Sequence, residues 1–438
     1  MENSTNHQWT TIFLIKTDES LWNQSTQMLD DLLTLAIRPE TALIICLCGE
    51  TGYLQTIDPT LHFPPGEDVS TVRTAFYSME PLAQPAGGRK SMLQRIGRDS
   101  KFDIMNPGHI SKFFTRYVLG GYSAKKYLLF TWGHGATYGM YPRNIPKTEP
   151  GETPRPLKWN MLSIAGLAGA IKSSFGNRPD QKVNVVIMMN CYMHLFDTGL
   201  TLAGAGVDFL VAAENTESAV GYNYKAIFGR LFNHPAIRPE ALAKLAVISL
   251  KKMRYPNKAE NARDPLQDTA FFANDLRLYA GMAVLLDKLS ILLTDRLNNH
   301  FKDIDDAVNF CDYCASSTYP VKDLFRFLQQ IRARTSRTDT RNAAVHDLIE
   351  RIDGLRKRLV LQKYWGAVLK ATQPNKYPLG CSISLPEAGD ASKAFYITYM
   401  QQASPYATDF SKDYHWSVFV KKYLKLAHKD EMFSDRVK

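Results

Sequence analysis

Short apolar segments alternate with amphipathic stretches along the first half of this 438-residue chain, and no other feature constrains its fold as strongly. The apolar segments are residues 10–15, 42–48, 126–131, 183–189 and 207–213. Each is continuously apolar, which is the pattern of a strand buried on both faces. Helical periodicity occupies residues 21–36, 109–121, 162–175, 195–206 and 238–253. This alternation predicts a mostly parallel sheet with helices on both faces.

The rest of the chain divides into loops and a helical region. Residues 59–108 and 140–157 are rich in proline, glycine and polar residues, and we expect loops or insertions there. The later part of the chain is mainly helical, with a short strand-like run at 381–385. We therefore predict a sheet-bearing domain over residues 1–260 and a mainly helical region over residues 261–438.

Composition indicates an ordinary globular protein. With 45% hydrophobic and 22% charged residues, the chain can bury a large core. The first 25 residues lack the basic start and apolar run of a secretory signal, and no apolar run approaches 18 residues. The 6 cysteines are too few for a disulfide scaffold in a chain of this length. We expect a cytoplasmic protein without a membrane span.

The net charge of +10 is concentrated in residues 321–370, where 12 Lys or Arg residues stand against 5 Asp or Glu residues. Such a window could meet nucleic acid, an anionic membrane or an acidic partner. However, Ile349, Ile352, Leu355 and Leu359 repeat at helical spacing between the basic residues, which favours a solvated helix face. We therefore expect no nucleic-acid binding.

Reactive side chains follow two of the predicted strands. Residues 126–131 lead to Gly133, His134 and Gly135, and residues 183–189 lead to Asn190 and Cys191. In a parallel sheet, chemistry gathers beyond the carboxyl ends of the strands. If these strands are neighbours, an imidazole and a thiol meet there, and the imidazole can take the proton of the thiol. The backbone N–H groups of Gly135 and Cys191 could then bind an oxyanion.

These segments resemble the clostripain-like cysteine peptidases, which share a clan with caspases, legumain, gingipains and separase. WTTIFLIKTDESL is similar to the opening strand and acidic turn of that family, and YSAKKYLLFTWGHGATYG to its histidine segment, YPADKYMLILWDHGSGW. VNVVIMMNCYMHLFDTGL resembles IDVIGFDACLMGMIEVAYEL, and VDFLVAAENTESAVGYNY resembles ADYLVASEETEPGYGWDY. The similarity continues into FFANDLRLYAGM and CSISLP, so it spans nearly the whole chain in order.

The resemblance implies a caspase-like three-layer α/β sandwich with a mostly parallel sheet and a helical C-terminal extension. It implies a cysteine endopeptidase with Cys191 as nucleophile, His134 as general base or imidazolium partner, and Gly135 as an oxyanion contributor. The missing secretory signal leads us to expect that this endopeptidase is intracellular. Asp197 stands where the family has a glutamate, six residues after the cysteine, and would support the site from behind. No cofactor is required. Calcium dependence occurs in some relatives, but no calcium-binding loop is recognisable here.

The chain departs from the family pattern beside the nucleophile. Met189 replaces an aspartate that helps to bind an Arg or Lys side chain of the substrate, and Asn190 replaces the following alanine. These two positions would line the substrate pocket. Glu214 and Glu217, in the loop after the next strand, either restore the negative charge or point to solvent. We expect a retained preference for Arg or Lys before the cut.

Several alternatives remain open. Relatives commonly cut themselves in the loop between the histidine and cysteine strands, where Lys147 and Lys158 are the best candidate sites in this chain. The Cys-x-x-Cys pair at Cys311 and Cys314 is compatible with a redox couple or half a zinc site, although core positions are favoured. The missing aspartate suggests a catalytically degenerate, partner-binding member. A regulated defence or cell-death protease with a basic sensor region, and an unknown activating partner, is a further alternative.

Overall fold

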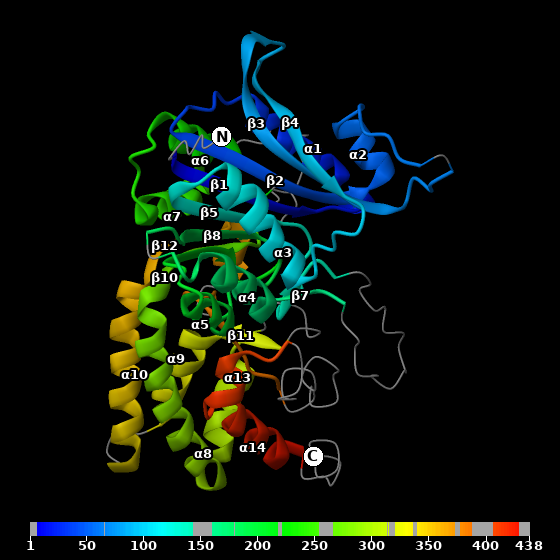
Figure 1. The fold of residues 1–438 in the computed structure, drawn as a ribbon. Coiled ribbons are helices and arrows are strands. Elements are labelled where there is room, and N and C mark those ends of the chain that lie inside the picture. Colours follow the sequence, from blue (N-terminus) through cyan, green and yellow to red (C-terminus); the bar gives the residue numbers. More distant parts are fainter. Residues whose placement is uncertain are drawn as a thin grey trace.

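The computed structural model describes residues 7–64, 66–142, 160–178, 180–217, 221–253, 266–312, 314, 320–335, 340–372, 377–387 and 406–428. In Figure 1 a twisted central sheet lies between two layers of helices, and a group of C-terminal helices extends from one side of this sandwich. Most of the chain therefore contributes to one layered assembly.

Nine strands within the described residues form the central sheet, in the order β12-β10-β9-β8-β5-β1-β2-β3-β4. The five central strands run parallel: β9 (Phe209–Ala213), β8 (Val183–Met189), β5 (Ala124–Trp132), β1 (His7–Lys16) and β2 (Thr41–Glu50). The outer strands pair antiparallel: β10 (Ala270–Asp275) and β12 (Val360–Trp365) beyond β9, and β3 (Val72–Ala86) and β4 (Arg89–Asp99) beyond β2. The five parallel strands are the five predicted apolar segments, so this part of the prediction is confirmed.

Two apolar cores, one on each face of the sheet, hold the helices in place. The first face is covered by α1 (Trp22–Leu33), α2 (Thr51–Ile57), α6 (Tyr224–Asn233) and α7 (Pro239–Ile248). The second is covered by α3 (Pro107–Phe113), α4 (Ile164–Phe175) and α5 (Phe196–Gly204). Alternate strand residues supply the two cores, because Phe13 stacks on Phe130 at 4.8 Å on the first face while Tyr127 packs edge-on against Phe175 at 5.0 Å on the second.

The segment 59–108 is not the loop that its composition predicts. It contains the long antiparallel hairpin of β3 and β4, which projects from the edge of the sheet in Figure 1. The turn consists of Gly87 and Gly88, whose φ angles of 58° and 79° suit a two-residue hairpin loop. Proline, glycine and charged residues interrupt the apolar pattern from which strands are predicted. An edge strand exposed to solvent does not need a continuous apolar run.

The C-terminal part is mainly helical, as predicted, but the sheet extends past the predicted boundary at residue 260 through β10 and β12. Its helices are α8 (Tyr279–Phe310), α9 (Leu324–Arg334), α10 (Thr340–Leu359), α11 (Ala367–Thr372), α13 (Asp409–Asp413) and α14 (Trp416–His428). Two small sheets pair β11 (Val321–Asp323) with β13 (Ser382–Ser384), and β6 (Gly139–Met140) with β7 (Leu162–Ser163). None of the helices in the described part of the chain is long and apolar enough to cross a membrane.

Candidate active site

The strands that precede His134 and Cys191 are neighbours in the sheet, as the sequence predicts. β5 and β8 pair in parallel up to Trp132 and Met189, and the N–H of Gly133 then donates to the carbonyl of Met189 at 3.2 Å. Parallel strands end at the same edge of a sheet. The loops that carry the imidazole and the thiol therefore begin side by side.

Gly135 brings these two loops into backbone contact. A Cβ atom at this position would lie 2.3 Å from the carbonyl oxygen and 2.7 Å from the nitrogen of Cys191, so any side chain would force the loops apart. Among the described residues, no backbone carbonyl accepts a hydrogen bond from the Gly135 N–H or the Cys191 N–H. The Cys191 N–H lies close to its own thiol, whose pKa it lowers. Two backbone N–H groups thus lie at one point, which suits an oxyanion.

The His134 ring is held by the loop that follows β1. Its Nε2 lies 3.1 Å from Oδ2 of Asp18 and 3.3 Å from Oγ of Ser20, and Ser20 donates to Asp18 through both its hydroxyl and its N–H. The hydrogen bond with His134 is the largest of the effects that lower the pKa of Asp18 to about 2. An ionised acceptor at Nε2 favours the tautomer that leaves Nδ1 as the basic nitrogen.

The Cys191 thiol is partly buried under the loop that carries Glu217. Glu217 N–H donates to Sγ at 3.3 Å, and the thiol donates to the Glu217 carbonyl at 3.7 Å. Burial raises the pKa of the Cys191 thiol to about 11, although the Glu217 N–H acts in the opposite direction. Within the described residues no hydrogen bond joins this thiol to His134. The arrangement is that of a neutral, resting thiol.

Tyr192 anchors the same loop from the residue after the nucleophile. It adopts the left-handed conformation with φ of 62°, its N–H donates to the Asn215 carbonyl at 3.2 Å, and its hydroxyl bonds the Thr216 hydroxyl at 2.8 Å. Non-glycine residues in this conformation cost energy and are found preferentially at functional sites. Tyr192 therefore couples the conformation of the Cys191 turn to the loop that covers the thiol.

Met189 and Asn190, both predicted to contact substrate, have different surroundings. Met189 is buried, and its Sδ accepts a hydrogen bond from the Tyr224 hydroxyl at 3.6 Å. Asn190 is only 1% exposed, and its Nδ2 donates to the Gly133 and His134 carbonyls at 2.8 and 3.2 Å. Asn190 is turned into the protein between the two loops, and a contact between its side chain and the substrate stays a prediction.

The structure separates the two candidate glutamates. Glu214 is completely buried against the C-terminal region, where its carboxylate accepts from the Gly380 N–H at 3.1 Å and from the Cys314 thiol at 3.6 Å. Burial, with a further contribution from the neighbouring Asp323, raises its pKa well above the usual range. Its carboxyl group is thus engaged by Gly380 and Cys314, and neither glutamate points to solvent.

Glu217 lies on the Met189 side of the site. It is 6% exposed, and neither carboxylate oxygen has a partner with hydrogen-bonding geometry among the described residues. Burial raises the pKa of Glu217 well above its usual range, and the backbone N–H of Asn190 offsets this only in part. After burial, the charge of Glu217 is the largest of the effects that raise the pKa of Tyr222. The Glu217 carboxyl group is thus buried near Tyr222 and Tyr224, and Tyr224 in turn contacts Met189.

Other predicted residues lie further from the thiol. Asp197, in the first turn of α5, accepts from the Thr408 hydroxyl at 2.7 Å and so connects the helix that follows Cys191 to α13. No group of three or more His, Cys, Asp or Glu side chains in the described ranges could hold a metal ion. The Cys314 thiol donates to the Glu214 carboxyl group, as described above. Lys147 and Lys158 lie outside the described residues.

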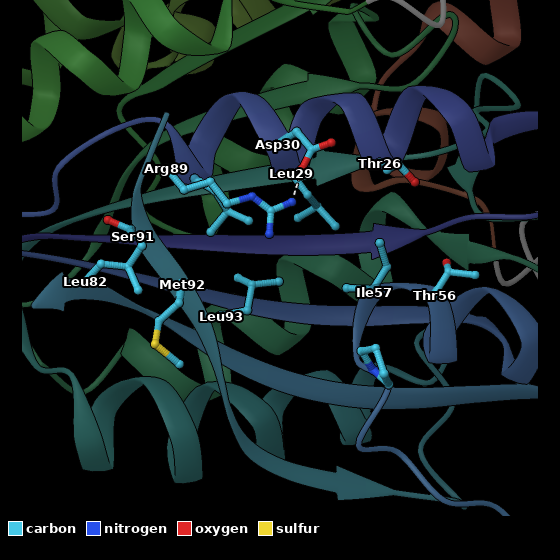
Figure 2. A pocket seen from close by; sticks show the side chains of 12 residues that line it. Thr26, Leu29, Asp30, Thr56, Ile57, Leu82, Arg89, Ser91, Met92 and Leu93 are labelled. Atoms are coloured by element: carbon cyan, nitrogen blue, oxygen red, sulfur yellow. Dashed lines mark hydrogen bonds and ion pairs between the residues drawn. The ribbon is translucent and has the colours of Figure 1, made fainter. Parts of the chain in front are cut away.

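A surface pocket lies between α1 and the β3–β4 hairpin, away from these groups (Figure 2). Arg89 and Asp30 form an ion pair of 2.7 Å across it, and apolar side chains such as Leu29 and Leu93 make up much of its wall. None of the residues predicted for the site lines this pocket. It is therefore separate from the chemistry at the strand ends.

Asp18 is a functional candidate that we did not single out from the sequence. The sequence shows an acidic turn after the first strand, but strand order alone pairs His134 with Cys191 and not with this turn. The signal was present, because β1 lies next to β5 in parallel and its end must fall beside His134.

Comparison with known proteins identifies the group to which this arrangement is similar. The model of the clostripain family, Peptidase_C11, matches residues 89–423. The sequence matches no curated protein. An inactive zymogen C11 protease from Parabacteroides distasonis is 15% identical with a TM-score of 0.60, covering 95% of this chain and 98% of that chain.

Two further similar structures come from Bacteroides thetaiotaomicron. The secreted C11 cysteine protease "iotapain" is 13% identical with a TM-score of 0.57, covering 93% of this chain and 99% of that chain. A secreted C11 cysteine protease in complex with an irreversible peptide inhibitor is 13% identical with a TM-score of 0.52, covering 82% and 84%. The predicted fold class, a caspase-like three-layer sandwich with a helical C-terminal extension, is confirmed.

Proposed function

This chain belongs to the clostripain family and is therefore a cysteine peptidase that acts on polypeptides, and from that premise we propose that Cys191 and His134 are its catalytic dyad. The observation that supports the proposal is the close approach of the two loops at Gly135, because the thiol, the imidazole and the two backbone N–H groups then belong to one edge of the sheet. A nucleophile, a base and an oxyanion site are the parts that acyl transfer requires.

In the first half of the reaction, the Sγ–H proton passes to His134 Nδ1 while Sγ attacks the carbonyl carbon of the scissile bond. The carbonyl oxygen becomes an oxyanion, which accepts hydrogen bonds from the Gly135 and Cys191 N–H groups. The C–N bond then breaks, His134 gives its proton to the departing amine, and a thioester remains on Cys191.

In the second half, water attacks the thioester and gives a proton to His134. The C–S bond breaks, the acid product leaves, and the proton returns to the thiolate. The resting thiol is covered by the Glu217 main chain. Substrate binding therefore has to displace this loop, which is consistent with an enzyme that needs activation.

We further propose that Glu217 provides the negative charge for an Arg or Lys side chain before the cut. Its buried carboxyl group has no partner of normal hydrogen-bonding geometry among the described residues, and an unpaired buried charge is costly. A substrate cation would supply the missing partner. Met189 and the tyrosines around it would pack against the aliphatic part of that side chain.

A peptide library incubated with the purified protein, beside its Cys191→Ala form, tests the proposal. We expect new chain ends after Lys and Arg that depend on Cys191, identified by mass spectrometry. Binding of peptides without Cys191-dependent cleavage would instead favour the degenerate, partner-binding alternative. Self-cleavage at Lys147 or Lys158, an activating partner and a cytoplasmic location stay predictions.

Asp18→Asn is expected to lower kcat about 10- to 100-fold, because the amide cannot hold the His134 tautomer as a carboxylate does. Since the pKa of Asp18 is lowered to about 2, its carboxylate is fully ionised above about pH 4, and the hydrogen bond that this carboxylate accepts from His134 is lost as the pH falls towards 2. The loss of kcat should therefore be constant between pH 5 and 9. Steady-state kinetics on a peptide substrate measure this.

Glu19→Gln is the matched control, since it removes the same charge from the neighbouring exposed position. Its kcat should remain within about twofold of wild type, as expected for a surface charge. An equal loss in both variants would show that the net charge of the turn matters, and not the contact with His134.

The basic residues of α9 and α10 largely face partners within the protein. Arg356 and Lys357 pair with Asp353 at 2.8 and 3.3 Å, and Arg332 pairs with Glu350 at 3.2 Å. These pairs reduce the positive potential that a phosphate backbone would meet.

We therefore expect no binding of labelled duplex DNA or single-stranded RNA at about 150 mM salt, measured by fluorescence anisotropy. Arg356→Glu with Lys357→Glu should leave this result unchanged. A strong signal that falls steeply with salt in wild type, and is lost in the double variant, would contradict the expectation and support a sensor region.

A further inference from the structure

A chain of buried hydrogen bonds crosses from β5 to β8 directly behind the candidate dyad. The Thr131 hydroxyl donates to Oδ1 of Asn190 at 2.6 Å, and Nδ2 of Asn190 donates to the carbonyls of Gly133 and His134. Thr131 is fully buried, and Asn190 is nearly so. The Asn190 side chain thus returns to the loop that precedes the imidazole, while its own main chain leads into Cys191.

The donor on Thr131 fixes the orientation of the Asn190 amide. Because a hydroxyl donates to Oδ1, the NH₂ group must face the two carbonyls, and the reversed amide would place oxygen against oxygen. The His134 carbonyl also accepts from the Tyr141 N–H at 2.9 Å. The His134 backbone is therefore held from two directions, by Asn190 and by Tyr141.

We propose that Asn190, oriented by Thr131, is a positioning residue that fixes His134 relative to Cys191. This inference rests on the dyad proposed above. A displacement of about 1 Å at a reacting group costs on the order of 100-fold in rate. The Asn190 side chain bonds to Thr131, Gly133 and His134. Its backbone N–H, which acts on Glu217, is retained when the side chain is removed.

The chain contains a matched control at the opposite end of the same two strands. Asn184 is also buried, its Oδ1 accepts from the Tyr127 N–H at 3.3 Å, and its Nδ2 donates to Asp208 at 3.0 Å. It thus bridges β5 and β8 as Asn190 does, but at the end remote from the strand termini that carry the dyad. Loss of either asparagine removes a buried cross-strand amide.

The experiment compares Asn190→Ala and Thr131→Val with Asn184→Ala in the full-length protein. We expect kcat to fall about 10- to 100-fold in Asn190→Ala and about 3- to 10-fold in Thr131→Val, with KM within about threefold. Asn184→Ala should keep kcat within about threefold even though its melting temperature falls. Equal kcat losses in the Asn190 and Asn184 variants, or wild-type kcat in Asn190→Ala, would overturn the proposal.

Alkylation of Cys191 by iodoacetamide provides a readout that does not depend on turnover. Asn190→Ala should reduce the His134-dependent part of the labelling rate and change its pH profile towards that of His134→Ala. In a His134→Ala background, Asn190→Ala should have no further effect. A further decrease in that background would mean that Asn190 acts on Cys191 directly, which contradicts positioning through His134.

The same measurements separate this inference from the proposed function. If wild type shows no Cys191-dependent cleavage but His134-dependent labelling that Asn190→Ala weakens, the function fails and the positioning role stands. If cleavage depends on Cys191 while Asn190→Ala behaves as wild type in both assays, the function stands and the positioning role fails. Labelling that is independent of His134 in wild type would overturn both.

Discussion

Cys191→Ala should abolish peptide cleavage, with a loss of about 10⁴-fold or more, since no other group at this edge of the sheet can form the thioester. Cys314→Ala is the matched control, because Cys191 and Cys314 are the two partly exposed cysteines while Cys46, Cys48, Cys311 and Cys381 are buried. The control should cleave at close to the wild-type rate. Cleavage by Cys191→Ala above about 1% of wild type would disprove the mechanism.

The pKa of the thiol gives this prediction a second measurement. Because burial raises the pKa of Cys191 to about 11, the resting thiol is neutral at pH 7, and labelling by iodoacetamide should rise steadily as the pH approaches 11. The same shift contributes to folding stability below about pH 8.5, where the thiol of the unfolded chain is also neutral, and this contribution is lost as the pH rises through 11.

A peptide substrate should change that labelling behaviour. A substrate-like inhibitor that occupies the site should protect the thiol completely at pH 7, whereas labelling without inhibitor should remain slow because the thiol is neutral and lies under the Glu217 main chain. Fast labelling at pH 6 in the free protein would show that the thiol is already ionised. The loop would then not hold the site in a resting state.

The fold was largely predictable because its central strands are buried on both faces. Continuous apolar runs such as 126–131 and 183–189 are not compatible with exposed strands. Because a helix lies between successive strands, each strand is expected to run parallel to the one before it. The strands β3 and β4 were not predicted, because an edge strand carries charges and prolines as a loop does. Strand β10 was not predicted, because its apolar run, 270–275, is short and lies in an otherwise helical region.

The site was predictable only where strand ends determine it. That the loops carrying His134 and Cys191 begin side by side follows from neighbouring strands, whereas the contacts of Asn190 and Glu214 depend on which way a side chain turns in a loop. Alternation along β9 explains the second case, since Ala213 faces the first core and the next residue faces the C-terminal region. The orientation of the Glu217 side chain could not be predicted in this way, because Glu217 lies in a loop where the alternation of a strand no longer applies.

Glu217→Gln should lower kcat/KM for peptides with Lys or Arg before the cut by about 100-fold, because a buried cation would then lack its charged partner. Cleavage after an uncharged residue such as norleucine should change less than about threefold. Glu214→Gln is the matched control. Its carboxyl group is already engaged by Gly380 and Cys314, so the ratio of kcat/KM between basic and uncharged substrates should remain that of wild type.

Stability should respond in the opposite direction to activity. Since the pKa of Glu217 is raised in the folded protein, folding is favoured while the carboxyl group is protonated, and this contribution is lost as the pH rises above the pKa of the unfolded chain, about 4.3. The glutamine variant cannot ionise, so its melting temperature at pH 7 to 8 should equal or exceed that of wild type. The proposed binding of a substrate cation would explain why a group that lowers stability stands at this position.

The pH dependence of specificity completes the test of Glu217. A substrate cation binds the ionised carboxylate, and the raised pKa means that ionisation increases as the pH rises, so the kcat/KM ratio of lysine over norleucine peptides should increase with pH in wild type. In Glu217→Gln the ratio should be low and independent of pH between 5 and 9. Suppose instead that wild type, Glu217→Gln and Glu214→Gln all prefer an uncharged residue before the cut and share one kcat/KM ratio that does not change with pH. Glu217 then does not select the substrate. The carboxylate lost with Met189 would then have no replacement here, and the enzyme would favour uncharged residues before the cut.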